Sequence, residues 1–468
     1  MDFESSTEKV DLGIPQGSPI SPILYLFYNA DLLEESLDIS LSITPMGFVD
    51  DISLLTFSET TIRNVRNLKK AYRKCLNWAR SHGSRFNPEK SELIHFIGRK
   101  RGAYDTPITL EGEKIKPSKT IRLLGVYLDR GLTYKAHFEA LNTKIPKLLS
   151  ALKSVTASTW GTSLLDARKL YRGAIRPILA YGALFWYPKD SNRVETLKKS
   201  LESIQGRFLR AITGAYKAAS IEALEIETFI EPLDLYLEKS ASQGAARQIL
   251  RGYGREGRLY REILRNRYRR RGQLRLESYS IPTLRTSRDS RPEIIETPAT
   301  ENARIAGEER TTLFNAIWKE YKKALEAFYA SKWKDRWEKS KKGRAIALFR
   351  PQPTQKALEL YKNRTKPFCS ILIQLRTEKI GLNGFLKRAR VPNIEALCEC
   401  KEEEETIGHF LFKCPRWKEQ RASLNGLKTV KEALETRDNS EKVVRFLLAT
   451  KRLEQFSRTD CELALEAK

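Results

Sequence analysis

Two adjacent carboxylates, Asp50 and Asp51, stand in the otherwise apolar stretch GFVDDISLLT, residues 47–56. A carboxylate among apolar neighbours is costly unless it is paired or binds a metal ion. A divalent cation would offset both the repulsion between the two groups and their desolvation. The stretch therefore indicates a metal-dependent site, and the alternative is that aspartate is present because it favours turns.

The two aspartates can approach one site together only where the chain turns, because neighbouring side chains on a regular strand point to opposite faces. The flanking residues 46–49 and 52–57 each have the composition of a short strand. This pattern predicts a β-hairpin with Asp50 and Asp51 at its tip.

A tight loop is predicted upstream, in the sequence PQGSP at residues 15–19. Gly17 would let the backbone approach a ligand closely, although such a loop could also simply connect a strand to a helix. Ser21 and Pro22 would supply the N-cap and the first residue of a helix that extends to residue 35. We expect this helix to bury Ile23, Leu24, Phe27 and Leu33.

A second set of chemically able residues lies near the C-terminus, in the pattern Cys398-x-Cys400-x8-His409-x4-Cys414. Three thiols and one imidazole are the number and type of ligands that close a tetrahedral zinc site. The alternative is a group of buried thiols with a capping histidine. The acidic loop KEEEET, residues 401–406, argues against direct nucleic-acid contact and favours a structural role for the zinc.

The charge of the chain predicts a polyanionic partner. Its 468 residues hold 84 Lys and Arg against 58 Asp and Glu, a formal net charge of +26. Such a field attracts nucleic acid. An anionic membrane surface is the alternative, but no Lys-rich amphipathic helix of the kind that binds membranes is evident.

The location of the protein is predicted from its N-terminus, its apolar runs and its cysteines. The first ten residues, MDFESSTEKV, have the character of neither a signal peptide nor a transit peptide. The longest apolar stretch, residues 177–188, is too short to span a bilayer. Six cysteines in a chain of this length do not form a disulfide framework. We therefore expect a cytoplasmic or nuclear protein without a membrane partner.

Beyond residue 130 the pattern is mainly helical. Apolar residues recur at spacings of three and four over residues 192–212, which predicts a helix with one buried stripe. Trp333 and Trp337 stand one helical turn apart and are expected in the core.

An arginine-rich tract separates two helical regions. Residues 247–275 contain eleven arginines and only two acids, with tyrosines interleaved. Both a solvated basic linker and a surface for phosphate contact and base stacking fit this composition. Residues 276–310, rich in Pro, Ser, Thr and Glu, have the composition of a linker.

The sequence PQGSPISP followed by FVDD resembles the reverse transcriptases of non-LTR (LINE-type) retrotransposons, particularly those of filamentous fungi. Four further stretches are similar to later parts of this family: a palm motif, the primer-grip region, helices of the thumb and the conserved tail, at residues 86–96, 121–129, 201–238 and 369–386. The resemblance covers most of the chain except the arginine-rich tract and the linker.

The resemblance implies an RNA-directed DNA polymerase that uses two Mg²⁺ ions. Asp50 would be a ligand of both ions, and Asp51 would be the supporting carboxylate. Carboxylates are needed because one ion activates the primer 3′-hydroxyl and both stabilise charge during the in-line displacement. The implied partners are an RNA template, a DNA primer and deoxynucleotides.

The resemblance also assigns residues that contact the substrates. Gln16, Gly17 and Ser18 would shape the pocket for the incoming nucleotide and the template. Lys90 would lie near the leaving pyrophosphate, and a solvated surface lysine is the alternative. Phe48 would pack beside the primer end. The C-terminal zinc knuckle is likewise a feature of related tails.

The resulting expectation is an α+β fold: a partial reverse-transcriptase palm, made of a β-hairpin plus helices, followed by a mostly α-helical thumb and C-terminal region with a small zinc knuckle. The expected divisions are a palm, a helical thumb or connection, a basic tract with linker, a helical tail region, a zinc-knuckle-like segment and a helical C-terminus, at residues 1–130, 131–245, 246–310, 311–390, 391–425 and 426–468.

Two features depart from the family pattern. The family supplies another metal-binding aspartate several dozen residues before PQGSP, whereas Asp2 and Asp11 stand too close to that loop. Residues 276–312 are too few for the ribonuclease H domain that many fungal relatives carry. We therefore expect an N-terminally truncated, internally deleted copy that does not polymerise alone. The alternatives are a catalytically dead RNA- or DNA-binding protein and an element remnant without function.

Overall fold

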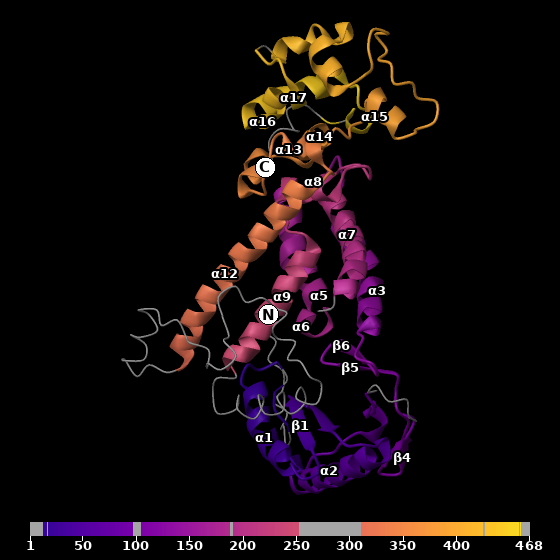
Figure 1. Ribbon diagram of the computed structural model, residues 1–468, viewed down its shortest axis with the longest axis vertical. Coiled ribbons are helices and arrows are strands. Elements are labelled where there is room, and N and C mark those ends of the chain that lie inside the picture. The colour runs from indigo at the N-terminus through magenta and orange to yellow at the C-terminus, as the bar shows by residue number, and fades with distance from the viewer. Residues whose placement is uncertain are drawn as a thin grey trace, which may run out of the picture. The chain divides into compact units, whose positions relative to one another are not determined.

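The computed structural model describes residues 13–15, 17–96, 104–187, 191–251, 310–424, 426–457 and 459. Contacts divide the chain into an N-terminal unit, residues 1–140, and a C-terminal unit, residues 141–468. Figure 1 labels the elements of both. Most of the arginine-rich tract and the linker, residues 252–309, lie outside the described residues.

The described part of the N-terminal unit contains three two-stranded antiparallel hairpins, two α-helices and a short 3₁₀ turn, η1. In chain order its elements are α1 (Ser21–Ser36), β1 (Ile43–Phe48), β2 (Asp51–Thr56), α2 (Thr61–Ser81), η1 (Pro88–Lys90), β3 (Ile108–Leu110), β4 (Glu113–Ile115), β5 (Thr120–Leu123) and β6 (Val126–Asp129), before α3 (Lys135–Lys153) begins. The predicted hairpin forms from β1 and β2. Helix α2 is capped by the side chain of Thr60, which accepts a hydrogen bond from the backbone of Arg63.

Helices α1 and α2 cover one face of the β1–β2 hairpin (Figure 1). The buried cluster there joins both helices to β2 through Leu32, Cys75, Trp78, Ala79, Ile52 and Leu54. The opposite face carries Met46 and Phe48, which are 43% and 58% exposed. Because side chains alternate along a strand, the hairpin has one covered face and one that we call the open face.

The apolar side chains expected in the core at the start of α1 are exposed. Ile23, Leu24 and Phe27 are 52%, 47% and 76% exposed, and Leu33 is half-buried, so this prediction was wrong for the first three. The reason is that α1 contacts the hairpin along the side that carries Asn29 and Leu32, which are 5% and 1% exposed. The apolar composition of the helix did not show which side that would be.

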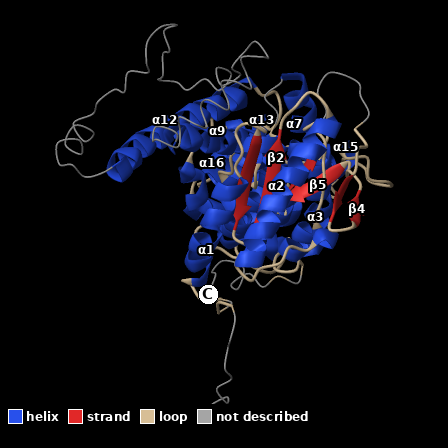
Figure 2. Cartoon of the chain, turned by 90° about the horizontal axis from the view of Figure 1, so that it is seen from below, coloured by secondary structure: helices blue, strands red, loops and turns tan. Residues whose placement is uncertain are grey.

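The C-terminal unit is helical in its described residues, and helices predominate in Figure 2. Its longer helices are α7 (Ser191–Thr213), α8 (Ile221–Thr228), α9 (Leu233–Arg251), α12 (Arg310–Lys339), α14 (Lys366–Arg376) and α17 (Arg437–Thr450). The shorter helical segments are α4 (Leu164–Leu170), η2 (Tyr171–Ile175), α5 (Arg176–Ala180), α6 (Ala183–Trp186), α13 (Arg344–Ala347), η4 (Gln355–Tyr361), α15 (Asn383–Arg388), η5 (His409–Lys413), η6 (Pro415–Trp417), η7 (Gln420–Leu424), α16 (Val430–Glu435) and η8 (Glu454–Phe456). No described helix is both long and apolar enough to cross a membrane.

The predicted amphipathic helix and tryptophan pair are confirmed. Helix α7 spans residues 191–213 and buries a stripe that includes Phe208 and Ile212. Trp333 and Trp337 of α12 lie in one buried cluster with residues of α8 and α9. Ion pairs also link α12 to α9, with Asp234 and Arg336 at 2.8 Å.

A buried ion pair connects α8 to α14. Nε and Nη2 of Arg376 donate to the same carboxylate oxygen of Glu227 at 2.9 and 2.8 Å, and both side chains are 0% exposed. The Tyr361 hydroxyl donates to the other oxygen, and Nη1 of Arg376 donates to the backbone oxygen of Leu434 at 2.5 Å. The guanidinium lies 4.1 Å from the ring centroid of Phe349. Both charged groups of this ion pair are therefore surrounded by hydrogen-bond partners and an aromatic ring of the protein.

Candidate functional site

The two aspartates lie at the tip of the β1–β2 hairpin, Asp50 in the loop and Asp51 at the start of β2. Phe48 pairs with Asp51 across the strands, so Val49 and Asp50 form a two-residue loop. The φ angle of Val49 is 54°, a strained conformation for a β-branched residue. Both aspartates are exposed. The expectation that their apolar neighbours would desolvate them was therefore wrong, because the hairpin holds both at its solvent-facing tip.

Helix α1 fixes the tip through a buried asparagine. Nδ2 of Asn29 donates to the backbone oxygen of Val49 at 2.6 Å. Burial raises the pKa of Tyr25 on the same helix, and the nearby carboxylate of Asp50 also raises it. The role of Asn29 was not predicted, because a single amide in an apolar helical run does not indicate which distant backbone group it will bind.

The open face of the hairpin brings together three of the predicted site residues. Phe48 and Asp51 are direct cross-strand partners, and Asp50 follows Phe48 by two residues at the tip. A ligand could contact the exposed ring of Phe48 and both carboxylates without moving the covered face.

The predicted substrate loop forms a turn before α1. The backbone nitrogen of Ser18 donates to the Pro15 oxygen at 3.3 Å, and Gly17 has a φ of 94°, which favours glycine. Ser21 is the first helical residue, and its hydroxyl donates to Pro15 at 2.7 Å, while Ile20 occupies the cap position. The predicted N-cap role of Ser21 was therefore wrong. Gln16 lies outside the described residues.

Lys90 and the substrate loop are not joined to the aspartates by direct bonds. Lys90 is exposed at the end of η1, which the Asn87 side chain caps by accepting from the backbone of residue 89 at 3.0 Å. Within the described part of the N-terminal unit, no hydrogen bond or ion pair links Lys90 or Ser18 to Asp50 or Asp51. Their roles in contacting the substrate stay predictions.

The hairpin tip places two carboxylates side by side along the chain, at Asp50 and Asp51. Asp50 and Asp51 offer the hard oxygen ligands that Mg²⁺ prefers. However, among the residues that the structure describes, no third acidic, cysteine or histidine ligand gathers with them. Binding of metal ions by Asp50 and Asp51 stays a prediction.

The Cys and His residues predicted to bind zinc do lie together. Cys398, Cys400, His409 and Cys414 bring their ligand atoms within 4.8 Å of one another. The Sγ atoms of Cys398 and Cys414 are 3.7 Å apart, and Sγ of Cys400 is 3.3 Å from Nε2 of His409. Zn–S bonds of about 2.3 Å in a tetrahedron separate the sulfur atoms by about 3.8 Å. The donor set and its spacing therefore fit zinc.

Three glutamates of the acidic loop beside this cluster form ion pairs within the C-terminal unit. Arg452 donates to both oxygens of the buried Glu405 at 2.7 and 2.6 Å. Arg388 pairs with Glu404 at 2.7 Å. Glu403 lies 3.2 Å from Lys413 and 3.5 Å from Nδ1 of His409. The loop thus links the cluster to surrounding helices.

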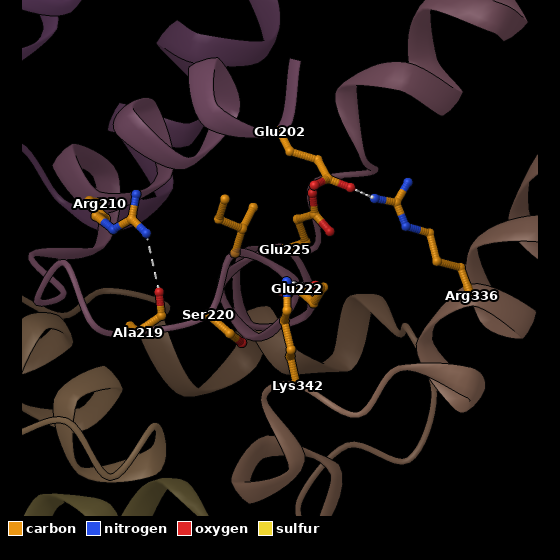
Figure 3. Close-up of a pocket in the computed structure, with 9 residues that line it drawn as sticks. Glu202, Arg210, Ala219, Ser220, Glu222, Glu225, Arg336 and Lys342 are labelled. Atoms are coloured by element: carbon orange, nitrogen blue, oxygen red, sulfur yellow. Dashed lines mark hydrogen bonds and ion pairs between the residues drawn. The ribbon is translucent and has the colours of Figure 1, made fainter. Parts of the chain in front are cut away.

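A cavity of about 190 Å³ lies between α7, α8 and α12 (Figure 3). Its charged walls are internally paired, with Glu202 2.5 Å from Arg336 and Glu222 3.7 Å from Lys342. Burial raises the pKa of Glu225 well above its usual range, and Gln205 donates to this carboxyl at 2.9 Å. We interpret the cavity as part of an internal polar network.

Comparison with known proteins relates both units to mobile elements. Residues 1–128 match the family model described as reverse transcriptase (RNA-dependent DNA polymerase). The chain is 24% identical over 421 residues to the "Putative 115 kDa protein in type-1 retrotransposable element R1DM" of Drosophila melanogaster. The aligned region covers 89% of this chain and 35% of that protein.

Shorter similarities involve other insect proteins. The chain is 26% identical over 215 residues to the "RNA-directed DNA polymerase from mobile element jockey" of Drosophila funebris, covering 45% of the chain and 23% of that protein. It is 29% identical over 145 residues to a "Retrovirus-related Pol polyprotein from type-1 retrotransposable element R1 4" of Nasonia vitripennis, covering 31% and 36%. The chain therefore spans about a third or less of these relatives. No solved structure matches it.

Proposed function

We propose that the chain is part of an RNA-directed DNA polymerase of a non-LTR retrotransposon, with its nucleotidyl-transfer site at the tip of the β1–β2 hairpin. The observation that carries this proposal is the pair Asp50 and Asp51 at the solvent-facing tip, within the segment that matches the reverse-transcriptase model. The similarity to retrotransposon proteins over most of the chain supports the same reading.

The residues of the tip have distinct roles in this proposal. Asp50 and Asp51 would hold Mg²⁺, which when bound activates the primer 3′-hydroxyl and stabilises the charge of the displacement. Phe48 would pack against the primer end on the open face. Asn29 keeps the strained loop in place through its bond to Val49, so that the carboxylates are positioned before substrate binds.

We also propose that this polypeptide does not polymerise by itself. The described residues gather two carboxylates at the tip, and in this proposal a further ligand completes the site. Gln16, Gly17, Ser18 and Lys90 would then contact the nucleotide and the pyrophosphate in the completed site. The zinc cluster would hold the C-terminal loop in place rather than take part in catalysis.

Primer extension on an RNA template tests the proposal. The purified chain with Mg²⁺ is compared with Asp50→Asn, and the expected result is no extension by either protein. Extension that depends on Asp50 would place the nucleotidyl-transfer site at the hairpin and overturn the proposal that further ligands are needed. Extension that survives Asp50→Asn would overturn the assignment of the site to the hairpin.

A second candidate function is nucleic-acid binding without catalysis. The net charge of +26 favours it, because binding driven by phosphate contacts needs no complete metal centre. Retention of labelled RNA that weakens steeply with salt, in the absence of extension, would support this function. Absence of any retention at low salt would exclude it.

A further inference from the structure

Helix α2 carries a stripe of positive charge that the proposed catalytic site does not use. The helix contains seven Lys and Arg residues and no acid among 21 residues. Five of these cations are exposed and recur at helical spacing: Arg63, Arg66, Lys70, Arg73 and Arg80. At about 1.5 Å per residue, this cationic stripe extends for about 25 Å along the helix.

The stripe faces away from the β1–β2 hairpin. The opposite side of α2 buries Val65, Ala71, Cys75 and Trp78, and the last two of these pack in one cluster with Ile52 of β2. Helix α2 therefore packs on the covered face of the hairpin, and Phe48 lies on the other face. A ligand on the stripe and a ligand on the open face would occupy different sides of the N-terminal unit.

The charges of the stripe are not balanced by neighbouring acids. Lys74, on the flank of α2, pairs with Asp38 at 3.2 Å, but the five stripe residues have no ion pair within the described part of the chain. Like charges three or four residues apart destabilise a helix. By contrast, α12 intersperses lysines with acids and forms pairs such as Lys334 with Glu338 at 3.8 Å. A polyanion on α2 would relieve this repulsion.

We propose that the cationic stripe of α2 binds the phosphate backbone of a nucleic-acid duplex, at a surface separate from the hairpin tip. Four of its five residues are arginines, which pair well with phosphate. No aromatic side chain belongs to the stripe, so it lacks the stacking platforms by which single strands are usually held. Contacts of this kind position a duplex without reading its sequence.

A membrane surface fits the stripe less well. Basic helices that bind membranes also insert an apolar face beside the charged one. The apolar side of α2 is already buried against the rest of the N-terminal unit. Ala71 and Trp78, for example, are 0% and 2% exposed. The inference goes beyond the proposed function and shares with it only the class of partner.

The test measures binding of the full chain to a labelled RNA–DNA duplex by fluorescence anisotropy over a range of salt concentrations. The test variant changes all five stripe residues to Gln: Arg63→Gln, Arg66→Gln, Lys70→Gln, Arg73→Gln and Arg80→Gln. A control variant of equal charge loss changes five exposed lysines of α12 to Gln: Lys319, Lys322, Lys323, Lys334 and Lys339. Circular dichroism checks that both variants fold.

The expected result is a loss of about four to five from the slope of log K against log salt in the stripe variant, because each phosphate contact contributes about 0.9. The control variant should lose less than half as much. If the stripe variant does not fold, Arg66→Gln with Lys70→Gln should still lower the slope by about two, and an unchanged slope overturns the proposal.

Three other outcomes would overturn the inference. Equal losses in the stripe and control variants would show that only net charge matters. Loss of binding to phosphatidylserine vesicles with unchanged duplex binding would assign the stripe to membranes. If the unmodified chain binds no duplex at low salt, the nucleic-acid partner of the proposed function fails as well.

Discussion

Replacing Arg376 by Met should destabilise the C-terminal unit strongly. The substitution keeps much of the aliphatic volume but leaves the carboxylate of Glu227, which is 0% exposed, without its cation. It also removes the donor to the backbone oxygen of Leu434. Breaking a buried ion pair by removing one partner costs about 3–5 kcal/mol, and we expect a loss of this size in the free energy of unfolding.

A double-mutant cycle pairs this substitution with Glu227→Gln, which leaves an acceptor for the Tyr361 hydroxyl. In the double variant no unpaired charge is buried, so we expect it to recover about 1–2 kcal/mol relative to the sum of the single losses. Recovery should be incomplete because the oxygen of Leu434 still lacks its donor.

Urea unfolding followed by tryptophan fluorescence measures these differences, since Trp333 and Trp337 lie in the core of the same unit. A matched control is Arg388→Met, which breaks a pair with Glu404 whose side chains are 59% and 45% exposed. Exposed pairs contribute about 0–1 kcal/mol. The reasoning would be refuted if Arg376→Met cost no more than Arg388→Met, or if the double variant lost the full sum of the single losses.

Three further predictions concern the metal cluster, the hairpin tip and a buried lysine. Native mass spectrometry should find one zinc ion per chain, and Cys400→Ser should lower this occupancy; a chain that stays metal-free after refolding with zinc would contradict the assignment. Asn29→Leu should destabilise the N-terminal unit by about 1–3 kcal/mol, because the Val49 oxygen loses its donor, and unchanged hydrogen exchange at the tip would argue against this. Burial lowers the pKa of Lys366 to about 8, so between pH 8 and 10 the unfolded chain holds more protons at this site. In chemical denaturation, the free energy of unfolding of the unmodified chain, relative to that of Lys366→Met, should therefore rise with pH over this range. Parallel pH profiles of the two proteins would contradict this prediction.

The parts of the structure that depend on local sequence could be predicted. The strand-like composition on both sides of Asp50 and Asp51 predicted the hairpin, and apolar residues at spacings of three and four predicted α7. The Cys398 to Cys414 cluster was found because its four ligands lie within one short segment, so local spacing limits their distance in space.

The parts that depend on distant partners could not be predicted. The composition of α1 does not state which side meets the hairpin, so Phe27 was expected inside although it is 76% exposed. Asn29 carries no local sign that it will bind the loop twenty residues later. The acidic composition of residues 401–406 likewise did not show that Glu405 pairs with Arg452, 47 residues away.

The ion pair between Arg452 and Glu405 connects the segment that carries the zinc ligands to a residue further along the chain. A peptide ending soon after the zinc ligands would retain all four donors but lose Arg452 and leave behind a carboxylate that is 1% exposed in the intact protein. Such an unpaired group favours unfolding. The segment that carries the zinc ligands therefore depends on an arginine outside the ligand motif.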